Sequence, residues 1–231
     1  LKPIPLYESN ELALLKTHYY GGIKKYQWTA IPLELRGVVC VCRDGKMFKM
    51  KVCIGAEPED PKFVITDLLP HLASKQMQEK MIDGIKAENM NLLVGSRPSD
   101  TVDETWSEKI RLTVMEYLNH KYGMTEADFL SAELSCVPAF NSCDIGFDGS
   151  MVGAYGHDDR VCAYPAATAL MRMGETPKVT SVCLLVDKEE IGSDGVTGMQ
   201  SRFFDTFMAD LCRMQEVYPE VCYENSVCLS T

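Results

Sequence analysis

Two neighbouring glutamates offer the clearest chemistry in the sequence. Glu189 and Glu190 lie in the segment Asp187-Lys-Glu-Glu-Ile-Gly-Ser193, directly after an apolar run at residues 179–186. Because adjacent side chains at a strand end point in different directions, one carboxylate can bind a metal ion while the other takes a proton from water. Glu-Glu pairs are also common in solvated loops, and spacing alone favours that simpler explanation.

A second acidic group lies in Tyr155-Gly-His-Asp-Asp-Arg160, which follows a glycine-rich approach and opens a predicted helix. A carboxylate of Asp158 or Asp159 can ligate a cation, and two closely spaced metals need a bridging aspartate. The alternative is helix capping, which satisfies free backbone N–H groups without a metal. His157 is a further candidate ligand, because histidine is a common zinc donor.

Other catalytic motifs are missing from the sequence. It contains no HExxH, P-loop, GxSxG or CxxC motif. Phosphoryl transfer, serine hydrolysis and thiol chemistry therefore lack support. The histidines at positions 18, 71 and 120 have no metal-binding partner at helical spacing.

Composition indicates a folded α/β or α+β protein of one or two domains, since 46% of the 231 residues are hydrophobic and 24% are charged. The net charge of -10 argues against a nucleic-acid partner. Neither a membrane span nor a signal peptide is predicted, so we expect a soluble protein. The ten cysteines, scattered as small hydrophobes, fit a reducing, cytoplasmic setting.

The ends of the sequence predict a piece of a longer chain. The first residue is Leu1 and not Met, and the final stretch is apolar.

Local patterns predict the elements that position these groups. Asp44-Gly45 supplies the turn of a hairpin spanning residues 35–54. Thr101 and Glu104 have capping-box spacing before a helix that ends at Gly123. The other predicted elements are a short strand at 63–65, a helix at 72–88, the main helix at 104–122, a strand at 129–137, helices at 159–173 and 198–214, and a strand at 179–186.

Residues 146–156 are rich in glycine, so we place a domain junction near residue 145. After it, helices alternate with the apolar run at 179–186, which is typical of a strand buried on both faces of a largely parallel sheet. This alternation favours an α/β layer architecture. In such sheets ligands bind at the carboxyl ends of strands, which is where Glu189 and Glu190 fall.

Five segments together resemble a known family. In order and spacing they resemble the aspartyl aminopeptidase / aminopeptidase I family of dizinc metallopeptidases, especially its bacterial branch. The resemblance spans essentially the whole chain, and several moderately specific motifs in the right order make chance similarity improbable. The segments are Tyr20-Gly-Gly-Ile-Lys-Lys-Tyr-Gln-Trp28, Pro70-His-Leu-Ala73, Gly153-Ala-Tyr-Gly-His-Asp-Asp-Arg160, Val186-Asp-Lys-Glu-Glu-Ile-Gly-Ser193 and Gly198-Met-Gln-Ser201.

The resemblance implies a fold and an assembly. A layered α/β dizinc catalytic domain is expected, interrupted by a β-rich insertion that mediates dimerisation. On this basis residues 1–18 and 146–231 are parts of the catalytic domain, and residues 19–145 are the insertion. The resemblance also implies homodimers that build a dodecamer in the cytoplasm.

The same resemblance implies roles for individual residues. Asp158 matches the aspartate that bridges two zinc ions, Glu190 matches a zinc ligand and Glu189 the general base. His71 matches a histidine that reaches a neighbouring subunit's substrate pocket, and the position of His157 is not a metal ligand in the family. The implied reaction is zinc-assisted hydrolysis of a peptide's N-terminal residue, in which Glu189 moves a proton from water to the leaving amine.

The sequence also departs from the family pattern. A histidine in a His-x-Asp motif is expected before Leu1, and an aspartate and a histidine are expected after Thr231. Only Asp158 and Glu190 of five expected ligands are therefore present, whereas zinc normally takes about three or more protein donors. Two alternatives follow: a non-catalytic oligomerisation or scaffold fragment of such an enzyme, or a magnesium enzyme that uses the same carboxylates.

Overall fold

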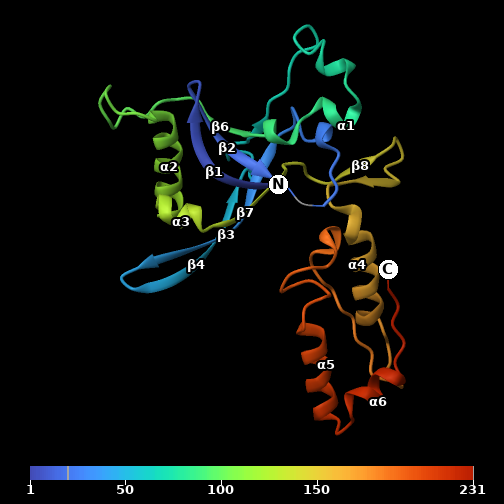
Figure 1. The fold of residues 1–231 in the computed structure, drawn as a ribbon. Coiled ribbons are helices and arrows are strands. Elements are labelled where there is room, and N and C mark those ends of the chain that lie inside the picture. The colour runs from blue at the N-terminus through green and yellow to red at the C-terminus, as the bar shows by residue number, and fades with distance from the viewer. Residues whose placement is uncertain (20, 231) are drawn as a thin grey trace. The chain divides into compact units, whose positions relative to one another are not determined.

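The chain forms a mixed α/β structure of two compact units (Figure 1). The computed structural model describes residues 1–19 and 21–230, and the units are Leu1–Asp144 and Ile145–Thr231. Within the described residues, every helix is too short or too polar to cross a membrane.

Two antiparallel sheets form the first unit. One has the strand order β1-β2-β6-β5 and the other has the order β4-β3-β7. The strands are β1 (Lys2–Ser9), β2 (Leu12–His18), β3 (Leu33–Arg43), β4 (Lys46–Ile54), β5 (Val64–Ile65), β6 (Leu92–Gly95) and β7 (Glu133–Pro138).

The hairpin of β3 and β4 confirms the prediction made from Asp44 and Gly45. Arg43 pairs with Lys46, and both turn residues have positive φ, 50° and 73°. One apolar cluster joins the two sheets and the helix that covers them, and its most buried members include Leu15, Leu33, Ile65, Leu92 and Phe129. Burial of this cluster away from water is the main stabilising contribution within the unit.

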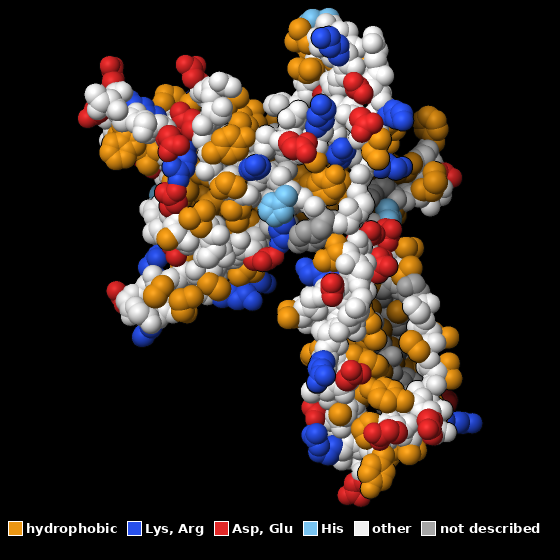
Figure 2. Space-filling model, in the orientation of Figure 1, with side chains coloured by type: hydrophobic (Ala, Val, Ile, Leu, Met, Phe, Trp, Pro, Cys, Tyr) orange, Lys and Arg blue, Asp and Glu red, His pale blue; other side chains and the backbone are white. Residues whose placement is uncertain are grey.

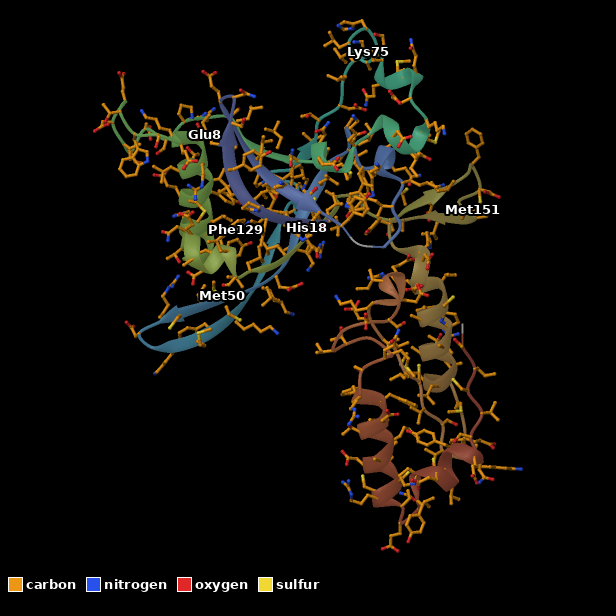
Figure 3. All side chains as sticks on the ribbon, in the orientation of Figure 1. Glu8, His18, Met50, Lys75, Phe129 and Met151 are labelled. Atoms are coloured by element: carbon orange, nitrogen blue, oxygen red, sulfur yellow. The ribbon has the colours of Figure 1, made fainter. Side chains whose placement is uncertain are left out.

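Helix α2 (Lys109–Tyr122) begins later than predicted. The expected capping box does not form, because the Thr101 hydroxyl bonds to Ser99 and Glu116 instead. The first turn is capped from β1: the Glu8 carboxylate accepts hydrogen bonds from the backbone N–H groups of residues 110 and 111, at 2.9 and 3.0 Å. Figure 3 shows Glu8 beside this helix. The predicted stop at Gly123 is confirmed, with φ of 61°.

The predicted helix at 72–88 is wrong. Three short pieces occupy this stretch instead: η2 (Gln76–Gln78), α1 (Met81–Gly84) and η3 (Ala87–Asn89). Lys80 and Lys86, which precede the second and third pieces, have extended backbones. Four of the large apolar side chains here are exposed (Leu72, Met77, Met81 and Ile82), so a continuous helix would lack much of the packing that normally stabilises one.

The predicted strand at 129–137 begins only at β7. The residues before it form helix α3 (Glu126–Leu130), capped by a reciprocal capping box between Thr125 and Asp128. Sequence reasoning missed that box, although Thr-x-x-Asp has the right spacing. A further single-turn element, η1 (Lys25–Gln27), precedes β3.

Asp60 ties the loop after β4 to helix α2. Its carboxylate accepts hydrogen bonds from Lys121 Nζ at 2.8 Å and from the backbone N–H of Gly55 at 3.1 Å. These hydrogen bonds, that from Lys121 foremost, hold the pKa of Asp60 below its ordinary value of 3.8. A lowered folded-state pKa means that the charged carboxylate stabilises the fold above the unfolded-state pKa, and that this stabilisation is lost as the pH falls through the folded-state value.

We therefore expect Asp60→Asn to lower the free energy of unfolding by about 1 kcal/mol near neutral pH, a modest figure because the pair is partly solvated. The difference between wild type and variant should shrink as the pH falls below about 4. Urea unfolding of both proteins across this pH range measures it, with Asp100→Asn, an exposed aspartate of the same unit, as control. A difference between wild type and Asp60→Asn that is independent of pH would contradict the role of the charge.

The second unit is mainly helical. The boundary with the first unit falls within β8 (Cys143–Ile145), which pairs with β9 (Met151–Gly153) of the second unit. The remaining elements are α4 (His157–Met171), η4 (Glu189–Ile191), α5 (Phe203–Met214) and α6 (Pro219–Glu224).

The predicted buried strand at 179–186 is also wrong. Its residues form no strand ladder and most of its side chains are exposed to solvent; Val179 is 73% exposed and Leu185 58%. A buried strand needs neighbouring strands to satisfy its backbone groups, and the described residues of this unit place none beside it. Figure 2 shows other apolar side chains on the surface of the unit that contains α5 and α6.

Candidate metal centre

The turn η4 carries both glutamates singled out by the sequence. Lys188 and Gly192 flank it with positive φ, 71° and 81°, so the backbone turns sharply on both sides of Glu189 and Glu190. The backbone N–H of Ser193 closes this turn on the Lys188 carbonyl at 2.7 Å. Both glutamate side chains are exposed.

The loop after η4 folds back onto it. The backbone N–H of Gln200 donates to the Ser193 carbonyl at 3.2 Å, and the N–H of Asp187 donates to the Thr197 carbonyl at 3.1 Å. Gly198 is required for this path, because a Cβ atom there would lie 2.0 Å from the Ser193 carbonyl oxygen. The turn that presents the glutamates is therefore fixed by its own loop.

The first turn of α4 presents the aspartates. Gly156 precedes the helix with φ of 85°, and no side chain caps the helix by a hydrogen bond. Asp158 keeps a non-helical backbone, with φ of -81° and ψ of 113°, and the Asp158–Asp159 peptide is cis. The capping role considered for these aspartates is thus not observed, and both carboxylates are exposed.

Three carboxylates from these two segments lie together. Oxygen atoms of Asp158, Asp159 and Glu190 are all within 4.8 Å of one another. Segments about thirty residues apart in the sequence therefore converge, one at the start of α4 and one in η4. Asp159 joins the cluster although sequence reasoning gave it no settled role; its adjacency to Asp158 was the available signal.

The cluster concentrates negative charge. The pKa of the Asp159 carboxyl is raised above its ordinary value of 3.8, first by the hydrogen bond it shares with Asp158, then by desolvation and by the charges of Asp158, Glu189 and Glu190. Glu189 is therefore close enough for its charge to affect the pKa of Asp159. Carboxylates held this close repel one another, and a divalent cation relieves that repulsion.

The donor set suits a divalent metal ion. Aspartate and glutamate oxygens are accepted ligands of zinc, and three donors that converge from two fixed segments can form part of one coordination shell. A purely carboxylate set also suits magnesium. Two complete zinc shells need more donors than these three, and nitrogen donors are common among them.

The carboxylate cluster contains no histidine among the described residues. His157 precedes Asp158, but its ring Nε2 is 2.9 Å from the Val152 carbonyl oxygen, which places this atom in a hydrogen bond with the backbone. His71 belongs to the first unit, where it is exposed in the segment between β5 and η2. Among the described residues of the second unit, the candidate metal ligands that lie together are therefore all carboxylates.

Fold and site together define a mixed α/β protein with a candidate centre for a divalent metal ion. A family model described as aminopeptidase I zinc metalloprotease (M18) matches residues 1–231. The chain belongs to this family of zinc metallopeptidases, as the resemblance predicted.

Known relatives agree with this assignment. A Clostridium acetobutylicum protein named "Probable M18 family aminopeptidase 1" is 48% identical over 221 residues, which is 96% of this chain and 46% of that protein. A crystal structure of an M18-family aminopeptidase from Thermotoga maritima matches with a TM-score of 0.82 and 44% identity, over 93% of this chain and 45% of that chain. The chain thus spans about half the length of the relatives it matches.

A more distant structure shares the fold. The S. cerevisiae protein whose structure is titled as the mApe1 dodecamer is 20% identical, with a TM-score of 0.60 over 90% of this chain and 44% of that chain. At this identity the likeness concerns the fold alone.

Proposed function

We propose that the protein to which this chain belongs is a zinc-dependent aminopeptidase that removes N-terminal residues from peptides. One observation carries the proposal. Carboxylate oxygen atoms of Asp158 and Glu190, which are far apart in the sequence, lie within 4.8 Å of each other in a member of a zinc metallopeptidase family. The proposal is for the complete protein, because the chain spans about half the length of its relatives.

We assign the metal ligands and the base as follows. Asp158 and Glu190 would hold the zinc, Asp158 as a ligand shared by two ions and Glu190 as a ligand of one, and the other half of the complete protein would supply the remaining ligands. When bound there, zinc would supply Lewis-acid polarisation of the scissile carbonyl. Glu189, next to Glu190 but outside the three-carboxylate group, accepts a proton from the attacking water and delivers it to the leaving amine. An oxygen atom of Asp159 lies within 4.8 Å of one of Asp158, which supports a role in orienting that ligand.

We also propose the domain roles and the assembly that the family resemblance implies. Residues 1–18 and 146–231 contribute to a layered catalytic domain, and residues 19–145 form a dimerisation insertion. Homodimers then build a dodecamer in the cytoplasm. A structure titled as a dodecamer shares the fold of this chain, which is compatible with the proposed assembly.

A chimera tests the proposed activity. In this protein, called here the Thermotoga chimera, the 231-residue chain replaces the matching span of the Thermotoga maritima relative, which supplies the other half. We expect it to hydrolyse an aminoacyl-p-nitroanilide, to lose activity with a chelator and to regain it with zinc. A folded chimera that binds zinc but hydrolyses nothing would favour the scaffold alternative, and recovery with magnesium alone would favour a magnesium enzyme.

His71 provides a prediction about the assembly. If its side chain reaches a neighbouring subunit's substrate pocket, His71→Ala should lower kcat/KM of the Thermotoga chimera by about tenfold or more, with unchanged zinc content. His120, an exposed histidine on α2, provides the matched control, and its alanine variant should keep full activity. Equal activity of both variants in an intact oligomer would show that His71 has no role in the substrate pocket.

A further inference from the structure

A cavity of about 490 Å³ lies in the first unit, between helix α2 and the two sheets. Core side chains form its inner wall, among them Leu15, Ile54 and Phe129, each at most 2% exposed. Glu59 and Arg97 also line it but are exposed, so the cavity opens to solvent beside them. Protein cores rarely leave voids much larger than a water molecule, whereas small-molecule sites have volumes in this range.

Hydrogen bonds along α2 hold the walls of the cavity in place. In the first half of the helix, the Thr113 hydroxyl donates to the Arg97 carbonyl at 3.0 Å, which ties the helix to the segment after β6. Near its end, Lys121 Nζ donates to the Asp60 carboxylate at 2.8 Å, which ties it to the loop after β4. The cavity is therefore formed before any ligand arrives, and a ligand does not have to order its walls.

The rim of the cavity carries two charges of opposite sign. The Arg97 guanidinium and the Glu59 carboxylate make no hydrogen bond or ion pair with the described residues, so both can contact a ligand. The wall behind them is mostly apolar, and the Thr113 hydroxyl that faces it already donates to a backbone carbonyl. A matching ligand is thus apolar in its body and charged at its exposed end.

We propose that this cavity binds a zwitterionic molecule with apolar side chains, of the class of a free apolar amino acid or an apolar dipeptide. Its side chains fill the cavity, its carboxylate pairs with Arg97 and its ammonium group pairs with Glu59. A ligand with only one charge would bring that charge near a rim residue of the same sign, so the opposite charges of the rim favour a zwitterion.

The proposal goes beyond peptide hydrolysis and does not rest on it. Molecules of this class are what the proposed peptidase would take up or release, but the cavity belongs to the first unit and the carboxylate cluster to the second. Binding at the cavity is therefore measurable in the 231-residue chain without any turnover.

Isothermal titration calorimetry of the 231-residue chain tests the proposal, with a chelator present so that hydrolysis contributes no heat. We expect leucine, leucyl-leucine or both to bind at one saturable site in or below the millimolar range. Tighter binding of the dipeptide would identify a dipeptide ligand, and tighter binding of leucine a free amino acid. N-acetyl-leucine amide, which keeps the apolar side chain but lacks both charges, should bind about tenfold or more weakly than the tighter of the two.

Variants then test where the ligand lies. Arg97→Gln and Glu59→Gln should each weaken binding of the tighter ligand by about tenfold or more, whereas Glu57→Gln, an exposed glutamate of the same loop outside the lining, should bind as the parent does. Val94→Phe places a larger side chain in the wall and should abolish binding.

Thermal unfolding of each variant shows whether it is folded. The proposal is overturned if neither leucine nor leucyl-leucine binds, if the neutral analogue binds as tightly, or if both rim variants keep the parent's affinity. A folded Val94→Phe variant with the parent's affinity would place the ligand outside the cavity and overturn it as well.

Discussion

Replacing Glu189 with glutamine should lower kcat of the Thermotoga chimera by about 10²–10⁴-fold, the usual contribution of a positioned general base. Glutamine keeps the shape of the side chain but cannot accept the proton of the attacking water. Because Glu189 lies outside the three-carboxylate group, the zinc content of the variant should match that of the parent. Steady-state kinetics and metal analysis of the same preparations measure both quantities.

Two controls make this prediction specific. Glu224→Gln, which changes an exposed glutamate of α6, should keep the parent's kcat. Glu190→Gln should lose activity together with zinc, since it removes a proposed ligand. If Glu189→Gln loses zinc in parallel with activity, Glu189 is a ligand and the assignment of the two neighbours is reversed; if it keeps full activity, it is not the base.

The second large effect is expected at Asp158. Loss of a residue that supports a ligand typically costs 10–100-fold in metal affinity, so removal of a ligand shared by two ions should exceed about 100-fold. We therefore expect Asp158→Asn in the Thermotoga chimera to bind zinc at least 100-fold more weakly, measured by competition with a chromogenic chelator. Activity at low zinc should fall with it.

Asp194 supplies the matched control for this change. It is an exposed aspartate in the loop that follows η4, and it is not among the three carboxylates that lie together. Asp194→Asn should therefore keep the zinc affinity of the parent. Unchanged affinity in Asp158→Asn, or an equal loss in both variants, would show that the carboxylate cluster does not hold the metal.

The parts of the fold that the sequence predicted are those that local chemistry determines. Asp44 and Gly45 have the conformational freedom that a two-residue hairpin turn needs, and Gly123 ends α2 in the left-handed region for the same reason. Both features depend on residues within a few positions of the turn. The structure accordingly confirms the predicted hairpin turn and the predicted end of α2.

The errors lie where distant segments decide the structure. The stretch at 72–88 has helical residues but leaves most of its large apolar side chains exposed, and the apolar run at 179–186 has no neighbouring strand among the described residues. The start of α2 depends on Glu8, which lies on a strand about a hundred residues earlier. Periodicity along the chain carries no information about such partners.

The candidate site shows the same division. Adjacent carboxylates at Glu189 and Glu190 were visible in the sequence, but spacing alone favoured a solvated loop. Family resemblance, and not spacing, linked them to Asp158, and the structure now places Asp158 within the same cluster as Glu190. Asp159 was left out because the resemblance matched Asp158 alone; the capping role considered for both aspartates is not observed.

Anomalous diffraction at the zinc absorption edge, from zinc-loaded crystals of the Thermotoga chimera, tests the central claim most directly. We predict zinc density bound by Asp158 and Glu190 together, with oxygen–zinc distances of about 2.0–2.2 Å and Glu189 uncoordinated. Zinc bound elsewhere, with these two carboxylates facing solvent, would contradict the account.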